Sequence, residues 1–394
     1  MIKRELYMKQ IRPFIGKDVV KVLTGIRRSG KSIMLELLCK EINFPHRSIL
    51  MNFESKKNSK YLKADALYDY ITRKVGDSKE KFYLFFDEIQ EVQKWEEAVS
   101  SFRVDFDADI YITGSNAKLL SGELATYIAG RYVQFVIYPF SFEEFREINK
   151  DHTFMDYLEI GGMPFLNSII DDKNAIKVYL DDVYNSIILK DVVKRNNIRD
   201  VDLLERIITY ILANIGQTFS ATSIAKYFKN EQRKVSTDTV LNYIRACEDA
   251  YLFYQIKRQE IKGKKILSVN EKYYVADHGL REAVYGKNNQ DIERVLENIV
   301  CLELLRRGYK VTVGIVDAVK EIDFIAVRNN KPVYIQVCYY LIEEATKERE
   351  FGNLEKINDN YPKYVISMDE FDMSRNGIRH LNIEEFLGKE GMAL

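Results

Sequence analysis

Apolar positions in the first third of the chain form short runs that alternate with segments of helical periodicity. The runs at 83–87 (YLFFD) and 109–113 (DIYIT) have the length of buried strands, whereas the segment after residue 31 repeats apolar residues at helical spacing. Alternation of this kind is typical of a parallel sheet covered on both faces. It predicts an α/β domain over residues 1–150, with strands at 18–24, 48–53, 83–87, 109–113 and 132–138 and helices at 31–41 and 92–102.

The pattern changes after residue 139. It becomes helical to about residue 218, then predicts two short helices and a hairpin, and returns to alternating strands and helices from residue 290. We predict a helical connector over 151–200, a helix–helix–hairpin domain over 201–285 and a C-terminal α/β domain over 286–394. The predicted elements are helices at 175–194, 202–214, 220–229, 236–250, 290–307 and 343–357, and strands at 251–257, 266–276, 309–313, 321–327, 333–338 and 364–367.

Length and composition narrow the class of protein. The chain has 394 residues, enough for two or three domains, and its 59 basic and 59 acidic residues give a net charge of zero. A nucleic-acid-binding surface would therefore have to be local. The four cysteines are far apart in the sequence and form no zinc-site or disulfide pattern. With no signal-peptide core at the amino terminus and no run of about 18 apolar residues, we expect a cytoplasmic protein without a membrane partner.

A complete phosphate-binding motif lies near the amino terminus. GIRRSGKS at 25–32 matches GxxxxGK[ST], follows an apolar strand and opens an amphipathic helix. Backbone N–H groups of such a loop surround phosphates, and the helix N-terminus adds favourable partial charge. We expect Lys31 to reach the β- and γ-phosphates of ATP and Ser32 to bind Mg²⁺. The predicted nucleotide-binding residues are Gly25, Ile26, Arg27, Arg28, Ser29, Gly30, Lys31 and Ser32.

Two acids end the strand at 83–87. Asp87 is placed to bind the magnesium ion, and Glu88 beside it can orient and deprotonate the attacking water. The pair therefore predicts hydrolysis as well as binding. Two arginines, Arg27 and Arg28, are unusual inside a phosphate loop; they contact either phosphate or an acid such as Glu54, and the sequence does not choose between these.

Six stretches of the chain carry a family resemblance: GIRRSGKS (25–32), FFDEIQ (85–90), ITGSNAKLL (112–120), AGRYVQFVIYPFSFEEF (129–145), GGMPF (161–165) and YYVADHGLR (273–281). By these stretches, residues 18–150 resemble the AAA+ ATPases, in a branch of prokaryotic proteins that pairs such a domain with a C-terminal region of unknown function. This resemblance implies a P-loop NTPase fold, and it gives the role of γ-phosphate sensor to Asn116 or to Ser115. Relatives in this family often form rings, which makes an oligomer an expectation here too.

The same resemblance places Arg131 where this branch carries a candidate arginine finger. A guanidinium there would stabilise charge on the transferring phosphoryl group, in its own chain or across subunits. The alternative is a surface or ion-paired arginine, and the sequence favours neither.

The segment 202–276 has the helix–helix–helix–hairpin order of a winged helix. Ser236 would cap the second helix of a helix–turn–helix, and the hairpin tip at 257–265 carries five basic residues in nine. Arg233, Lys234 and Arg245 could support this tip on a DNA backbone. Winged helices also serve as protein-contact modules, so a protein partner is the alternative to DNA.

The last segment carries Glu297 on an apolar helix and Asp323 in a strand that a turn connects to the next strand, 333–338. This arrangement resembles the restriction-endonuclease-like fold, in which Asp323 would match the first metal-binding acid and Glu297 an acid on a helix. Gln336 stands where a second acid belongs and Cys338 where a lysine belongs, so the chemistry lacks two of its groups. We expect this domain to be catalytically inactive and to have a structural or binding role.

Together these features predict a magnesium-dependent ATPase that couples nucleotide state to a winged helix and a nuclease-like domain, with DNA as a candidate partner. The alternative is a nucleotide-switched scaffold for protein interactions that turns over little ATP. Stimulation of the ATPase by DNA would separate these two functions.

Overall fold

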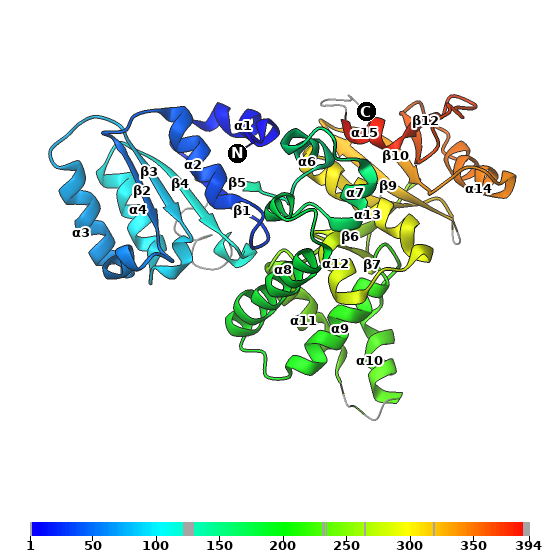
Figure 1. Cartoon of the computed structure of the whole chain (residues 1–394), viewed down its shortest axis with the longest axis horizontal. Helices are drawn as coiled ribbons and strands as arrows, with labels where there is room; N and C mark the ends of the chain where they lie inside the picture. The colour runs from blue at the N-terminus through cyan, green and yellow to red at the C-terminus, as the bar shows by residue number, and fades with distance from the viewer. Residues whose placement is uncertain are drawn as a thin grey trace. The chain divides into compact units, whose positions relative to one another are not determined.

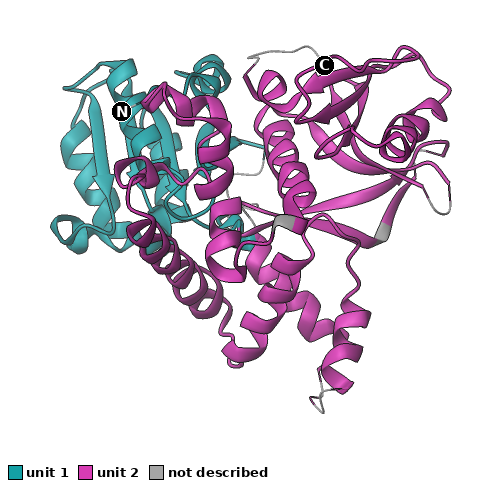
Figure 2. Ribbon diagram, turned by 45° about the vertical axis from the view of Figure 1, so that its right-hand side comes forward, with its two compact units in different colours: residues 1–139, 249–251 teal, residues 140–248, 252–394 magenta. Residues whose placement is uncertain are grey.

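The fold is taken from a computed structural model of the chain, which describes residues 2–120, 130–230, 233, 235–263, 265–317 and 320–388. The chain divides into two compact units (Figure 2). The first holds residues 1–139 with 249–251, and the second holds residues 140–248 with 252–394. None of the described helices is long and apolar enough to cross a membrane.

The first unit is a parallel sheet with helices on both faces (Figure 1). Its strand order is β2-β3-β4-β1-β5, and each neighbouring pair is parallel. The elements are α1 (Glu5–Ile11), β1 (Val20–Thr24), α2 (Lys31–Ile42), β2 (Ser48–Asn52), α3 (Ala64–Val75), β3 (Phe82–Asp87), α4 (Trp95–Asp105), β4 (Ala108–Gly114) and β5 (Tyr132–Val136).

The alternation of side chains along the central strands builds the core of this unit. Leu84 and Phe86 of β3 point to the face where Leu67 of α3 and Phe102 of α4 pack. Both sheet faces are covered, which explains why β1 and β3 are buried at every position. The α/β arrangement predicted from the hydrophobic runs is therefore confirmed, with each predicted strand within two residues of its expected bounds.

The second unit begins with helices and ends with a mixed sheet. Helix α8 runs directly into a π-helix at Ile187–Lys194, so the single helix predicted at 175–194 changes its hydrogen bonding part of the way along. The other elements are α6 (Phe142–Ile148), α7 (Phe154–Ile160), α8 (Lys173–Ser186), α9 (Val201–Ala213), α10 (Ala221–Asn230), α11 (Thr237–Asp249), β6 (Phe253–Glu260), β7 (Ile266–Val275), α12 (His278–Tyr285), α13 (Ile292–Arg306), β8 (Lys310–Ile315), β9 (Glu321–Arg328), β10 (Lys331–Val337), α14 (Glu344–Glu355), β11 (Lys363–Ser367), β12 (Arg379–Asn382) and α15 (Ile383–Gly388).

The hairpin β6–β7 is part of the C-terminal sheet. The strand order is β12-β11-β10-β9-β8-β6-β7, and β6 pairs in parallel with β8, with Arg258 opposite Val313. The predicted domain bounds place the hairpin in 201–285 and the remaining strands in 286–394. In the structure one hydrogen-bonded sheet spans both segments.

Two of the stretches that carry the family resemblance, GGMPF (161–165) and YYVADHGLR (273–281), contact each other through glycines and Asp277. The Asp277 carboxylate accepts the backbone N–H of Gly162 at 2.7 Å and that of Leu280 at 3.0 Å. A Cβ on Gly279 would overlap the carbonyl oxygen of Ile160. These residues therefore have a structural reason for their identities, since they fasten α12 to the chain that follows α7.

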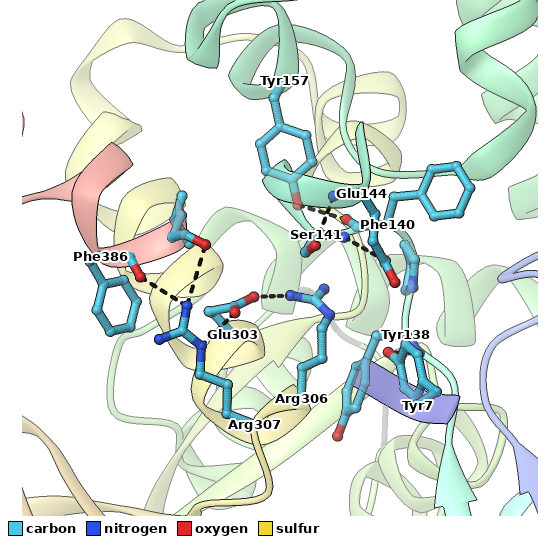
Figure 3. A network of polar contacts seen from close by, with 12 residues as sticks. Tyr7, Tyr138, Phe140, Ser141, Glu144, Tyr157, Glu303, Arg306, Arg307 and Phe386 are labelled. Carbon is cyan, nitrogen blue, oxygen red and sulfur yellow. Dashed lines mark hydrogen bonds and ion pairs between the residues drawn. The ribbon is translucent and has the colours of Figure 1, made fainter. Parts of the chain in front are cut away.

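Ionic contacts fasten the end of helix α13 (Figure 3). Glu303 pairs with Arg306 and, at 2.6 Å, with Arg307. Arg307 also donates to the carbonyl oxygen of Phe386 in α15 at 2.8 Å. The acid–base pairs satisfy charges that burial would otherwise disfavour, and they tie the C-terminal helix to α13.

A buried ion pair lies inside the first unit. Lys21 of β1 and Asp109 of β4 contact each other with both side chains fully buried, and Tyr111 also donates to Asp109 at 2.9 Å. Burial lowers the pKa of Lys21, and the charge of Asp109 opposes that shift. Removing the carboxylate would leave the lysine buried without its counter-charge.

We predict that Asp109→Ala destabilises the first unit by about 3–5 kcal/mol, the range for removing one partner of a buried pair. Trp95 is the only tryptophan of the chain and lies in the core of this unit, so its fluorescence in urea reports the unfolding. The matched control is Asp18→Asn, which removes an exposed partner of Arg103 and should cost less than about 1 kcal/mol. Equal unfolding midpoints for Asp109→Ala and wild type would contradict the prediction.

Candidate functional site

Three loops meet at the carboxyl edge of the first sheet. Parallel register sets Thr24 of β1 beside Gly114 of β4, and Phe86 of β3 beside Ile112 of β4. Because each strand ends at this edge, the segments that follow the strands come together there. The segments are 25–32 after β1, 87–88 after β3 and 115–116 after β4. The structure thus assembles the predicted phosphate loop, the two acids and the sensor residues.

The phosphate loop depends on two glycines. Gly25 has φ 138°, and a Cβ there would overlap the carbonyl oxygen of Ile137. Gly30 adopts φ 96° and immediately precedes α2. The Lys31 ammonium lies within the loop and donates to the carbonyl oxygens of Gly25 and Ile26 at 3.0 Å each. The loop therefore presents the start of a helix and a lysine at one point, as phosphate binding requires.

Asp87 is the centre of a polar network. Its Oδ1 accepts from the hydroxyls of Ser32 at 3.1 Å and Thr113 at 2.6 Å, and its Oδ2 accepts from the amide of Asn52 at 2.6 Å. A carboxylate and a hydroxyl are oxygen ligands of the kind that Mg²⁺ prefers. The structure thus places Ser32 and Asp87, the two residues predicted to bind Mg²⁺, in contact with each other, and both carry oxygen ligands suited to that ion.

Thr113 and Asn52 were not identified from the sequence. Both lie on strands that flank β3, and Asn52 is the register partner of Asp87 itself. Their position could have identified them, because each is a polar residue near the carboxyl end of a strand that neighbours β3.

Glu88 lies beside Asp87 in a strained backbone conformation. Its φ is 52°, and its backbone N–H donates to the Thr113 hydroxyl at 2.9 Å. The side-chain amide of Gln90 donates to the Glu88 carboxylate, which is largely buried. A carboxylate beside the predicted metal ligand Asp87, and held by its own neighbours, has the surroundings that a general base requires.

The sensor candidates follow β4. Ser115 and Asn116 are both buried, at the edge where the phosphate loop and Asp87 lie. The structure brings both to the site without separating their roles.

The arginines of the phosphate loop differ from one another. Arg27 forms an ion pair with Glu54, at 3.4 Å between Nη1 and Oε1. Arg28 is exposed and has φ 67°. Of the two alternatives left open by the sequence, the structure thus supplies an acidic contact for Arg27.

Arg131 lies at the opposite edge of the same sheet. Its carbonyl oxygen accepts the backbone N–H of Val20 at 2.9 Å, at the first residue of β1, whereas the phosphate loop follows the last. The four residue steps between Val20 and Thr24 correspond to about 13 Å of strand. Arg131 is exposed and, after Arg103, its charge helps to lower the pKa of Asp18. The structure therefore does not bring Arg131 to the phosphate loop of its own chain.

Ion pairs occupy part of the basic surface predicted for the winged-helix segment. Arg258 of β6 pairs with Glu321 of β9, and Arg233 pairs with Asp202 at 2.6 Å. Ser236 does cap α11, accepting the backbone N–H of Thr239 at 3.0 Å. The exposed basic side chains that remain are Lys257, Lys262, Lys265 and Arg245, while Lys234 and Lys264 lie outside the described residues.

The C-terminal sheet holds a second polar cluster. Glu297 of α13 accepts from the Lys272 ammonium at 3.2 Å and from the Tyr274 hydroxyl at 2.6 Å. On the neighbouring strands, the Gln336 side chain accepts the backbone N–H of Asp323 at 2.9 Å and donates to Glu350 at 2.5 Å. Lys272 was not identified from the sequence. It lies on strand β7 of the hairpin, whereas the lysine of the nuclease pattern was expected at position 338, just after β10.

The charges in this cluster are mutually satisfied or suppressed. Burial opposes a charge on Lys272, but the charges of Glu297, Asp323 and Glu321 outweigh it and raise the pKa of the lysine. Burial and the charge of Glu297 raise the pKa of Asp323 well above its usual value, and burial raises that of the Cys338 thiol. Within the described part of the chain, no His, Cys, Asp and Glu side chains form a group of three able to hold a metal.

Comparison with known protein families identifies an AAA domain in the part of the chain that forms the first unit. Residues 17–146 match the AAA domain family, and residues 151–291 match a domain of unknown function, DUF8612. An uncharacterized protein of Haemophilus influenzae is 37% identical over 400 residues, which cover 98% of each chain. Another, of Methanocaldococcus jannaschii, is 32% identical over 377 residues, covering 90% of this chain and 81% of its own.

Among solved structures, that of the Aeropyrum pernix ORC1 protein in complex with DNA aligns with 71% of this chain and 91% of its own. The identity is 11% and the TM-score is 0.29.

Proposed function

Because the chain belongs to the family of AAA-domain proteins that includes these two relatives, we propose that it binds ATP with magnesium and hydrolyses it. The observation that carries the proposal is the contact between Ser32 and Asp87 at the mouth of the phosphate loop. Lys31 would hold the β- and γ-phosphates, and Ser32 and Asp87 would hold the ion. Bound magnesium would neutralise developing phosphate charge.

Glu88 supplies the chemical step of this proposal. Its carboxylate orients a water and takes its proton as the water attacks the γ-phosphoryl group. Asn116, or Ser115 beside it, contacts the γ-phosphate and reports its presence to β4. Gln90 restrains the Glu88 carboxylate, so that the acid has a defined direction before nucleotide arrives.

We predict that Lys31→Ala abolishes ATP binding, whereas Glu88→Gln binds ATP but hydrolyses it about 100- to 10,000-fold more slowly, the range for losing a general base. The measurement is phosphate release with magnesium, together with ATP binding to each variant. Lys40→Ala, at an exposed lysine of the same helix, and Glu91→Gln, at an exposed acid three residues on, are the matched controls. An unchanged rate in Glu88→Gln would remove the general base from the mechanism.

We propose that Arg131 acts on the nucleotide of a neighbouring subunit and not on that of its own chain. Its place at the amino edge of the sheet separates it from the nucleotide of its own chain, so a finger role needs a second copy whose phosphate loop faces it. Its guanidinium would then stabilise charge on the transferring group of the neighbour.

We predict that Arg131→Ala and Lys31→Ala are each nearly inactive and that mixing them restores ATP hydrolysis. Each mixed interface can combine an intact phosphate loop from one variant with an intact arginine from the other. Phosphate release from the mixture, compared with each variant alone at the same total concentration, is the measurement. Wild-type activity of Arg131→Ala, or no recovery in the mixture, would contradict action across subunits.

For the second unit we propose contact with DNA through the exposed basic residues of the hairpin and of α11. The number of such residues is smaller than the sequence suggests, because Arg258 and Arg233 are paired with acids. The alternative function is a nucleotide-switched scaffold for a protein partner. The nuclease-like sheet has a structural or binding role in both, and magnesium-dependent plasmid cleavage that disappears in Asp323→Ala would overturn this assignment.

We predict that duplex DNA is retarded in a mobility-shift assay at 50 mM salt and released by about 200 mM, as for binding through phosphate contacts. Lys262→Glu with Lys265→Glu should remove most of the shift and any stimulation of ATP hydrolysis by DNA. Lys63→Glu with Lys74→Glu, exposed lysines of the first unit, make the same change in net charge and serve as control. No shift at low salt, with a flat ATPase rate, would favour the scaffold.

A further inference from the structure

A buried arginine contacts the phosphate loop from outside the motif. Arg4 directly precedes α1 and has φ 49°, and only 2% of its surface is exposed. Its Nη1 donates to the carbonyl oxygen of Ser29 at 2.8 Å, and its guanidinium lies 4.7 Å from the ring centre of Tyr7. A guanidinium carries several donors in a fixed plane, so it can hold more than one carbonyl at a defined angle.

The contact with Ser29 sets the direction of a functional N–H group. In a planar trans peptide the C=O and the following N–H point in opposite directions. Holding the Ser29 carbonyl on Arg4 therefore directs the N–H of Gly30 away from Arg4. This N–H belongs to the motif whose backbone donors surround phosphate. The guanidinium also places a positive charge next to an anion site.

The same guanidinium holds the end of the first unit. Its Nη2 donates to the carbonyl oxygen of Tyr138 at 2.8 Å and contacts that of Pro139 at 3.5 Å. The backbone N–H of Tyr138 is accepted by the Tyr7 hydroxyl at 3.1 Å, and both side chains are drawn in Figure 3. Ile137, one residue earlier, donates to the carbonyl of Thr24 at 2.7 Å. The phosphate loop and the last residues of the unit thus share one hydrogen-bonding residue.

We propose that Arg4 is a positioning residue of the nucleotide site, which orients the Ser29–Gly30 peptide for phosphate and links that peptide to residues 138–139. This inference rests on the proposed ATP function. It assigns to the amino-terminal segment a part in binding that the phosphate motif does not contain. Ser29 itself is fully buried, so the peptide has little freedom once its carbonyl is held.

The test compares three variants by titration with ATP and magnesium chloride and by their kcat and KM. Arg4→Gln should weaken ATP binding about tenfold and raise KM more than it lowers kcat, because it removes a hydrogen bond from a charged donor. Arg4→Lys keeps the charge but not the planar fork, so its affinity should lie between those of Arg4→Gln and wild type. Tyr7→Phe keeps the ring beside Arg4 but removes the hydroxyl that accepts the Tyr138 N–H, and it should bind ATP within about twofold of wild type.

Trp95 fluorescence in urea, without nucleotide, reports whether each variant is folded. A purely structural Arg4 would lower this midpoint but leave the affinity of the folded protein unchanged, and that result would overturn the inference. Should Arg4→Gln not fold, wild-type affinity in Arg4→Lys overturns it equally. If wild type itself does not bind ATP, the proposed function fails, which is a separate outcome.

Discussion

The Asp87 carboxylate is the group on which the rest of the nucleotide site depends. It accepts from three side chains that come from three different segments: Ser32 after β1, Asn52 at the end of β2 and Thr113 on β4. Each contact requires the parallel register that brings the strand ends to one edge. The Lys21–Asp109 pair lies inside the same sheet and fixes β1 against β4. The parallel register of the strands therefore determines both the packing of the core and the geometry of the site.

How much of this could be read from the sequence depends on distance along the chain. The phosphate loop and the pair Asp87–Glu88 are contiguous motifs, and their strand contexts were predicted correctly. Asn52 and Thr113 were missed because each reaches Asp87 from a neighbouring strand, and Lys272 because it reaches Glu297 of helix α13 from strand β7. The location of Arg131 could have been predicted from the sequence. Arg131 directly precedes strand β5, so it lies at the amino end of that strand, whereas the phosphate loop follows the carboxyl end of the parallel neighbour β1.

The second unit shows why a local pattern can mislead. Helices and a hairpin in this order predicted a winged helix, but the order carries no information about what β6 pairs with. Its pairing with β8 turns one basic residue of the predicted wing, Arg258, toward Glu321. Charge counted along a sequence therefore overstates charge at a surface. The same sheet brings Lys272 to Glu297, with which it forms an ion pair at 3.2 Å.

We propose that residues 25–32 and Asp87 together form a magnesium–ATP site. The decisive experiment is calorimetric titration of the full chain with ATP, in magnesium chloride and again in excess EDTA. We expect saturable binding at one site per chain, which weakens when the ion is removed, because Ser32 and Asp87 then have no cation to share with the phosphates. Absence of saturable heat with millimolar ATP and magnesium would contradict it.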